Sequence, residues 1–255
     1  MMRLIYGFCL FLNISLSWAS HEIVHIAVSS SIGNPLTSLC QKFNQSTKYG
    51  CKITTAPAGH LYAHIMHGMA YDLFLSADET YTEGLINAKK ADAQSRIAIA
   101  EGRIVLWSAD PKITPEALYQ ILTEKENIVI AIANPGASSY GAAAREMLQE
   151  YGLWTNIQSR LIYGKNIKHT YELIMTQRIP LGFISLAQLS PEVRARKQYW
   201  EPQTYRYKPV KHEVITLKAA KNQKALVAFR DFLRNDQSCQ ILSEAGYGCS
   251  NSLHT

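Results

Sequence analysis

The chain has 255 residues, 47% of them hydrophobic, and a formal net charge of +6. This composition is ordinary for a globular protein, and the length suffices for one large domain or two modest lobes. Lysines and arginines are scattered along the chain, which argues against a nucleic-acid-binding patch with interleaved aromatic residues.

The N-terminus has the three parts of an export signal. A short positive start, 1–3, precedes a mostly apolar run, 4–16, and Ser17-Trp18-Ala19 fits a small-x-small cleavage site. We expect residues 1–19 to be a signal peptide that is removed, so that the mature chain begins at Ser20. No later run approaches 18 uncharged apolar residues, so we expect the mature protein to be soluble.

The hydrophobic pattern predicts alternating strands and helices along the mature chain. We expect strands at 23–28, 51–55, 72–76, 103–108, 128–133, 161–163, 181–185 and 214–217. We expect helices at 35–44, 59–66, 80–88, 115–123, 141–151, 167–177, 224–234 and 238–245, with Ser31 or Asn34 capping the first and Asn166 the sixth.

This alternation predicts an α/β fold with parallel, doubly wound sheets. Both halves repeat a strand, a loop and a helix twice, which indicates two similar lobes that face each other. We expect residues 20–100 with 218–255 to form lobe 1 and residues 101–217 to form lobe 2.

Four strand-to-helix loops carry hydroxyl groups, Gly and Asn but no Asp or Glu: 29–31, 56–59, 137–141 and 165–167. A helix N-terminus offers unpaired N–H donors and a partial positive charge, so each such loop can hold an anion. Ligands of open α/β sheets bind beyond the carboxyl ends of the strands. Two lobes that face each other at these edges would bring all four loops into one cleft.

Four cysteines remain after signal cleavage, in two pairs that are close in sequence. An even number of cysteines in an exported protein favours disulfides. We predict the bridges Cys40–Cys51 and Cys239–Cys249; the alternative is four buried free thiols. The sequence has no Cys-x-x-Cys motif, which argues against a redox or zinc-ribbon role.

Nine segments of the chain, taken together with their order and spacing, match the pattern of a known family. They are residues 27–31, 61–65, 71–79, 102–108, 134–135, 140–143, 152–154, 163–167 and 181–185. With them the chain resembles the periplasmic molybdate-binding proteins of ABC importers, a branch of the type II solute-binding proteins, from about residue 24 to 248. The resemblance implies a periplasmic, monomeric receptor with a membrane permease as partner, no cofactor and no catalysis. It also implies that the two lobes are joined by a hinge, expected near 100–102 and near 217–221, and close on one tetrahedral oxyanion.

The resemblance also implies a set of ligand-binding residues. Ser31, with Ser30 beside it, matches the serine of the first loop, and Ala58 falls where the family usually has a second serine. Tyr140 and Ile167 match positions that donate backbone N–H groups, and Ser185 falls where some members have a tyrosine. Ala58 keeps an amide but lacks a hydroxyl, and we expect Ser29, Ser30 or Thr55 to compensate.

Neutral donors suit a fully deprotonated oxyanion. A buried dianion must have its oxygens satisfied, and N–H and O–H groups do this without a tight ion pair. Protonated phosphate brings its own O–H, and loops without a carboxylate cannot accept it. Molybdate, tungstate and sulfate carry no proton at neutral pH and are therefore compatible with such a site. The size of the cavity must distinguish the first two from sulfate.

Other functions remain open from the residues. A receptor for another oxyanion, such as sulfate, is the first alternative because of Ala58. A secreted serine hydrolase using Ser138 or Ser139, with His169 as base, is a second alternative, but the sequence lacks the Gly-x-Ser-x-Gly spacing.

Metal binding is a further alternative. His60, His64 and His67 share a helix face that could bind zinc or copper, and Tyr205 and Tyr207 are weak candidates for iron. Asp72, Asp78 and Glu79 could do acid–base chemistry, although Asp78 and Glu79 suit a helix start better.

Overall fold

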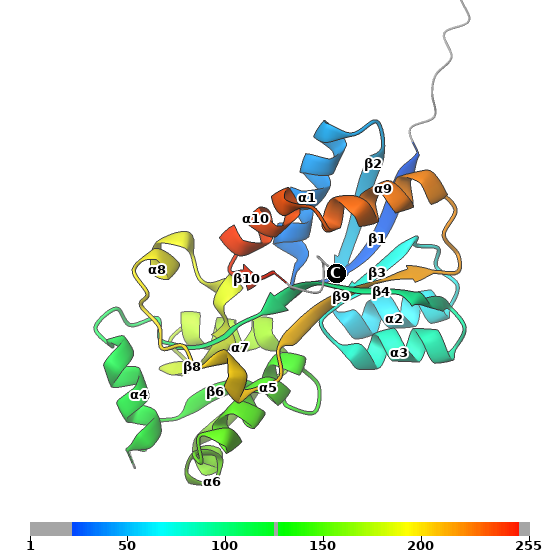
Figure 1. Ribbon diagram of the computed structural model, residues 1–255. Helices are drawn as coiled ribbons and strands as arrows, with labels where there is room; N and C mark the ends of the chain where they lie inside the picture. Colours follow the sequence, from blue (N-terminus) through cyan, green and yellow to red (C-terminus); the bar gives the residue numbers. More distant parts are fainter. Residues whose placement is uncertain (1–21, 125–126, 250–255) are drawn as a thin grey trace, which may run out of the picture.

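The computed structural model describes residues 22–124 and 127–249, which form two α/β lobes, each built on its own sheet (Figure 1). The predicted export signal, 1–19, lies outside these residues. The expected α/β fold with two lobes is therefore present.

The first lobe contains a six-stranded sheet in the order β10-β4-β9-β3-β1-β2. Its strands are β1 (Ile23–Ser29), β2 (Gly50–Ala56), β3 (Leu73–Ser76), β4 (Ala91–Gly102), β9 (Val210–Leu217) and β10 (Tyr247–Gly248). Strand β1 pairs in parallel with β2 and β3, whereas β9 is antiparallel to both β3 and β4. The carboxyl ends of β1, β2 and β3 consequently lie at one edge of the sheet.

Helices cover both faces of this sheet. One face carries α1 (Gly33–Ser46), α9 (Gln223–Leu233) and α10 (Asp236–Glu244), and the other carries α2 (Ala58–Met66) and α3 (Glu79–Asn87) (Figure 1). Phe43 of α1 packs edge-to-face against Phe229 of α9 with ring centroids 5.1 Å apart. Phe74 is fully buried on the α2 and α3 side.

The second lobe contains a four-stranded sheet in the order β5-β8-β6-β7. Its strands are β5 (Ile104–Trp107), β6 (Ile130–Ala133), β7 (Leu161–Gly164) and β8 (Leu181–Ser185). One face packs on α4 (Pro115–Thr123), α5 (Ser139–Glu150) and α6 (Trp154–Ile157), and the other on α7 (Ile167–Met175) and α8 (Pro191–Ala195). Strand β6 is parallel to β7 and β8, and β5 is antiparallel to β8.

The sheets are mixed, not fully parallel as the alternation predicted. Strands β5 and β9 run antiparallel to their neighbours because each enters its sheet directly from the other lobe, without a crossover helix. Strand β4 was not predicted at all. Its register shifts between Asp92 and Ile97 and again between Ala98 and Ala100, which breaks the two-residue alternation of buried side chains.

The chain passes between the lobes twice. The first passage is at Arg103, between β4 and β5, and the second precedes Val210, where β9 begins. The expected boundary at residue 217 differs from the strand pairing, because β9 pairs with β3 and β4 of the first lobe. By strand membership, the first lobe contains residues 22–102 and 210–249, and the second contains 104–207.

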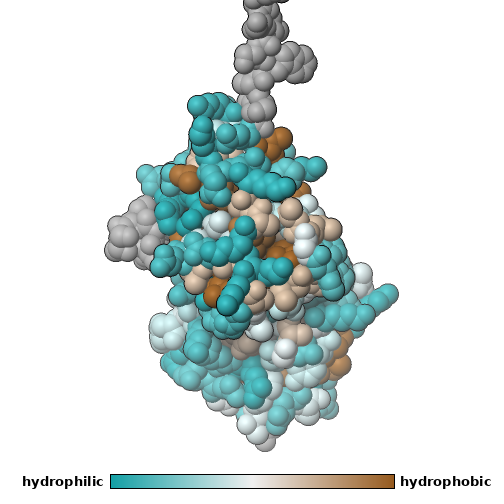
Figure 2. All heavy atoms as spheres, turned by 90° about the vertical axis from the view of Figure 1, so that its right-hand side faces the viewer, coloured by the Kyte–Doolittle hydropathy of each residue, from teal (hydrophilic) through white to brown (hydrophobic). Residues whose placement is uncertain are grey.

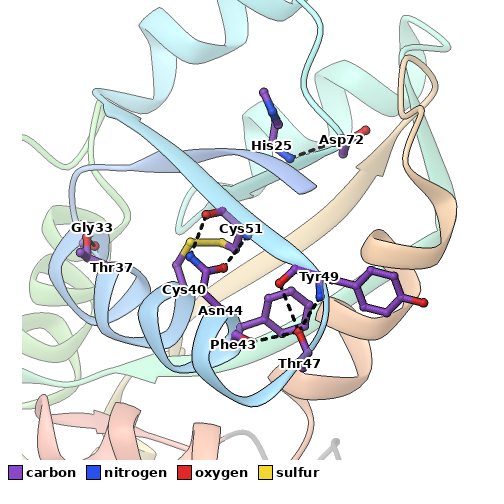
Figure 3. The surroundings of a disulfide bond; sticks show 10 residues. All are labelled: His25, Gly33, Thr37, Cys40, Phe43, Asn44, Thr47, Tyr49, Cys51 and Asp72. Atoms are coloured by element: carbon purple, nitrogen blue, oxygen red, sulfur yellow. Dashed lines mark hydrogen bonds between the residues drawn. A yellow bond between two sulfur atoms is a disulfide. The ribbon is translucent and has the colours of Figure 1, made fainter. Parts of the chain in front are cut away.

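Both predicted disulfides are present and both lie in the first lobe. Cys40 of α1 is joined to Cys51 of β2, with their Cα atoms 5.4 Å apart (Figure 3). The Asn44 side chain accepts a hydrogen bond from the Cys51 amide at 2.6 Å and donates to its carbonyl at 3.3 Å. Cys239 of α10 is joined to Cys249, with their Cα atoms 5.6 Å apart.

The surface is mostly hydrophilic in the view of Figure 2, with hydrophobic residues in small groups. Among the described residues, the large apolar side chains that reach the surface include Met66, Met69 and Val227. No helix in the described part of the chain is long and apolar enough to span a bilayer.

Candidate functional site

All four predicted loops meet in one cavity of about 330 Å³ between the lobes. Loops 29–31 and 56–59 come from the carboxyl ends of β1 and β2 in the first lobe, and loops 137–141 and 165–167 follow β6 and β7 in the second. Of the predicted site residues, the cavity is lined by Ser30, Ser31, Ala58, Tyr140 and Ile167. The structure thus brings together residues that lie more than 130 positions apart in sequence.

The first loop offers hydroxyl groups. The hydroxyls of Ser29 and Ser31 lie 2.7 Å apart, while the Ser30 amide donates to the Ala56 carbonyl at 3.0 Å. The expected cap of α1 by Ser31 or Asn34 is wrong, because Ile32 is the N-cap residue and no side chain caps this helix. The Ser31 hydroxyl therefore stays at the cavity wall.

The second loop offers backbone amides only. Pro57 precedes α2, and its carbonyl accepts hydrogen bonds from His60 and Leu61. The amides of Ala58 and Gly59, at the first two positions of the helix, have no acceptor within the helix. With Pro57, Ala58 and Gly59 at its end, this loop has no side-chain donor of its own.

The third loop presents the start of α5. Ser138 is the N-cap residue, but its hydroxyl makes no capping hydrogen bond and lines the cavity. The Ser139 hydroxyl donates to the Ala77 carbonyl of the first lobe at 2.7 Å, so the two lobes are in direct contact beside the cavity. The Tyr140 amide, in the first turn, has no acceptor within the helix.

The fourth loop presents the start of α7. The Asn166 side chain caps this helix, as predicted, by accepting from the His169 amide at 2.9 Å. Ile167 and Lys168 occupy the first two helical positions, so their amides have no acceptor within the helix. Lys165 and Lys168 also line the cavity, which adds positive charge to a site rich in N–H donors.

Ser185 lies behind the cavity wall instead of lining it. It is buried, and its hydroxyl donates to the Tyr140 hydroxyl at 3.1 Å. The Tyr140 oxygen is also 3.1 Å from Nε2 of His212 on β9, across the lobe boundary. Burial raises the pKa of Tyr140 and lowers the pKa of His212 to about 3, so both groups are neutral near pH 7.

Several lining residues, among them Tyr81, Asp78 and His60, lie outside the four predicted loops. Tyr81 and Asp78 come from the start of α3, and His60 comes from the first turn of α2. Asp78 caps α3 by accepting from the Thr80 amide at 3.0 Å, which confirms its expected place at a helix start. Its presence also corrects the expectation of a site without carboxylates, because one carboxylate does line the cavity.

A larger and more open hollow, about 550 Å³, adjoins this cavity and shares Ala77, Asp78 and 137–139 with it. Its other walls include Glu79, Glu146, Lys208 and Lys211. We place the site in the smaller cavity, because only there do all four loops meet.

The structure gives little support to the alternative chemistries. His60, His64 and His67 are exposed, and the described residues contain no group of three or more His, Cys, Asp or Glu that could hold a metal ion. The Ser139 hydroxyl donates to a carbonyl, and Nδ1 of His169 accepts from the Lys165 amide at 3.1 Å, so they do not form a nucleophile–base pair. The Asp72 carboxylate is buried and accepts from the amides of His25 and Lys221, both at 2.8 Å.

Comparisons with known proteins agree with this geometry. The family model of the bacterial extracellular solute-binding proteins matches residues 24–248. The molybdate-binding protein ModA of Rhodobacter capsulatus is 30% identical over 238 residues, which are 93% of this chain and 92% of that protein.

Solved structures show the same relationship. The periplasmic molybdate-binding protein of Azotobacter vinelandii has a TM-score of 0.76 at 26% identity, over 89% of this chain and 100% of that one. The sulfate-binding protein SubI of Mycobacterium tuberculosis has a TM-score of 0.71 over 91% of this chain and 89% of that one, but at 12% identity it shows the fold alone. With its two lobes, its interlobe cavity and a family match over nearly its whole described length, the chain belongs to the bacterial extracellular solute-binding proteins.

Proposed function

We propose that this protein captures molybdate or tungstate in the interlobe cavity and delivers it to the membrane permease of an ABC importer. The observation that carries the proposal is the convergence of four loops, three of which lead directly into helix N-termini with free amides. The names of the relatives from Rhodobacter and Azotobacter support molybdate as the ligand.

The donor set suits a dianionic tetrahedral oxyanion. Backbone amides and serine hydroxyls donate to oxyanion oxygens, and Lys165 and Lys168 raise the local positive potential. The oxygens of a tetrahedral anion can accept hydrogen bonds from both lobes at once. The ligand therefore favours the closed arrangement of the lobes over an open one. Opening the lobes breaks half of these contacts together, which permits release to a permease.

Export to the periplasm and a monomeric state belong to this proposal. The signal pattern of residues 1–19 supports export, and the family relationship supports a permease as partner. Binding needs no cofactor, because the oxyanion is itself the cargo.

Isothermal titration of the mature, ligand-stripped protein with molybdate, tungstate, sulfate and phosphate tests the proposal. We expect one-to-one binding of molybdate and tungstate, and at least tenfold weaker binding of sulfate and of phosphate. A preference for sulfate would instead support the second candidate, a sulfate receptor, which the absence of a hydroxyl at Ala58 favours. If none of the four anions binds, the proposed function is wrong.

A further inference from the structure

The second loop is the one loop of the four that brings no side-chain donor to the cavity. The first and third loops bring serine hydroxyls, and the fourth brings lysines, whereas Pro57, Ala58 and Gly59 bring amides alone. A buried oxyanion oxygen that lacks a donor loses the full benefit of a charge-assisted hydrogen bond. A ligand oxygen facing this loop can accept from the Ala58 and Gly59 amides, but any hydroxyl donor must come from another element.

Tyr81 reaches this place from α3. Its ring lines the cavity, and a Cβ added to Gly59 would lie 2.9 Å from the Tyr81 hydroxyl oxygen and 3.4 Å from the ring carbon that bears it. The hydroxyl is thus the end of the side chain nearest the second loop. The ring is held from behind by Tyr62 of α2, with ring centroids 5.4 Å apart.

The Tyr81 hydroxyl has no competing partner. Across residues 22–124 and 127–249, it makes no hydrogen bond to another protein group. It is also not one of the buried polar atoms that lack a hydrogen-bond partner. The nearby tyrosines differ in this respect, since the Tyr140 and Tyr247 hydroxyls are both hydrogen-bonded inside the protein. A phenol can donate one hydrogen bond, and here that donor is available at the cavity wall.

We propose that the Tyr81 hydroxyl is a direct ligand of the bound oxyanion and supplies the donor that residue 58 lacks. This inference rests on the proposed function, because it concerns the same cavity and the same class of ligand. Gly59 belongs to the arrangement, since any larger residue there would push against the hydroxyl.

Titration of Tyr81→Phe with molybdate and with tungstate tests this inference. The variant keeps the ring and loses only the hydroxyl, so we expect affinity for both anions to fall about ten- to one-hundredfold. The control is Tyr62→Phe, which belongs to the same ring pair but whose hydroxyl lies against Gly84 and outside the cavity. We expect its affinity to stay within twofold of the wild type.

A double variant separates the hydroxyl from the shape of the ring. Adding Ala58→Ser to Tyr81→Phe restores a hydroxyl at the second loop, and we expect most of the lost affinity to return. Urea unfolding of each variant verifies that it is folded. A Tyr81→Phe variant that binds as tightly as the wild type overturns the proposal, and so does a double variant with no recovery. If the wild type itself binds neither anion, it is the proposed function that fails.

Discussion

Tyr140 shows how one residue serves both the cavity and the connection between the lobes. Its backbone is part of the cavity wall, while its hydroxyl lies between Ser185 of the second lobe and His212 of the first. A Cβ on Gly102 would lie only 2.1 Å from that hydroxyl, so glycine is required where the chain leaves β4. The side chain thus ties the ligand site to the first passage between the lobes.

His212 makes stability depend on pH. Burial among Tyr140 and Tyr247 lowers its pKa to about 3, whereas an unfolded histidine has a pKa near 6.5. Between these values the unfolded chain binds a proton that the folded chain does not, so acid favours unfolding. We expect the free energy of unfolding to fall by up to about 1.4 kcal/mol per pH unit below pH 6.5.

Urea unfolding of the wild type and of His212→Gln between pH 5.0 and 7.5 measures this contribution. Glutamine does not titrate, so the variant is expected to lose stability less steeply as the pH falls. Carboxylates titrate mainly below pH 5, so they contribute little to the pH dependence of the free energy of unfolding between pH 5.0 and 7.5. Equal slopes for the two proteins would show that His212 is not the group responsible.

At the residue scale, much of the site was predictable from the four loops. Parallel strands place their carboxyl ends at one edge, so the sequence alone predicts that Ser31, Ala58, Tyr140 and Ile167 lie together. Tyr81 could not be predicted in this way, because it lies beyond the β3–α3 junction and its sequence neighbours suggest only a helix start. Its approach to the second loop is a tertiary contact between α3 and α2.

At the scale of elements, the sequence predicts best where local signals agree. Strand β6 is fully buried and α5 follows it with a run of alanines, and both were expected. Strand β4 has exposed and buried positions out of alternation because of its register shifts, so its periodicity is weak. The direction of β9 depends on β3 and β4, which are far away in sequence, and no local pattern encodes it.

The Cys40–Cys51 bridge joins two elements of the first lobe at the end away from the cavity. Cys51 is near the amino end of β2, and the second loop follows the carboxyl end at Ala56. We expect Cys40→Ala with Cys51→Ala to lower the free energy of unfolding by about 2–3 kcal/mol, from the loss of an 11-residue closed loop. Molybdate affinity of the folded variant should stay within twofold.

Urea unfolding and titration of the same preparation check both parts of this expectation. The matched comparison is Cys239→Ala with Cys249→Ala, which opens a loop of 10 residues elsewhere in the same lobe. A variant of the first bridge that keeps its stability but loses affinity would contradict a purely structural role.

At the scale of the whole molecule, the lobes are held together beside the cavity by the hydrogen bond from Ser139 to Ala77. Ser139→Ala removes the donor and leaves the Ala77 carbonyl without this partner. A net loss of about 0.5–1.5 kcal/mol from the closed state would weaken molybdate binding roughly two- to tenfold. The loss should appear mainly as faster release, because the bond forms only when the lobes meet.

Stopped-flow measurement of molybdate release from the wild type and from Ser139→Ala tests this. The same variant also tests the hydrolase hypothesis, because a hydrolase that used Ser139 as its nucleophile would lose all turnover. Unchanged release rates would mean that the Ser139 bond does not contribute to closure.

The position of β9 has a consequence for how the chain is made. This strand lies between β3 and β4, yet it is synthesised only after the whole second lobe. The first sheet therefore stays split, with β3 and β4 unable to join, until residue 217 has emerged from the ribosome. A nascent chain with its central strand missing remains unfinished through most of translation, which is the state that a translocation channel for unfolded polypeptides accepts.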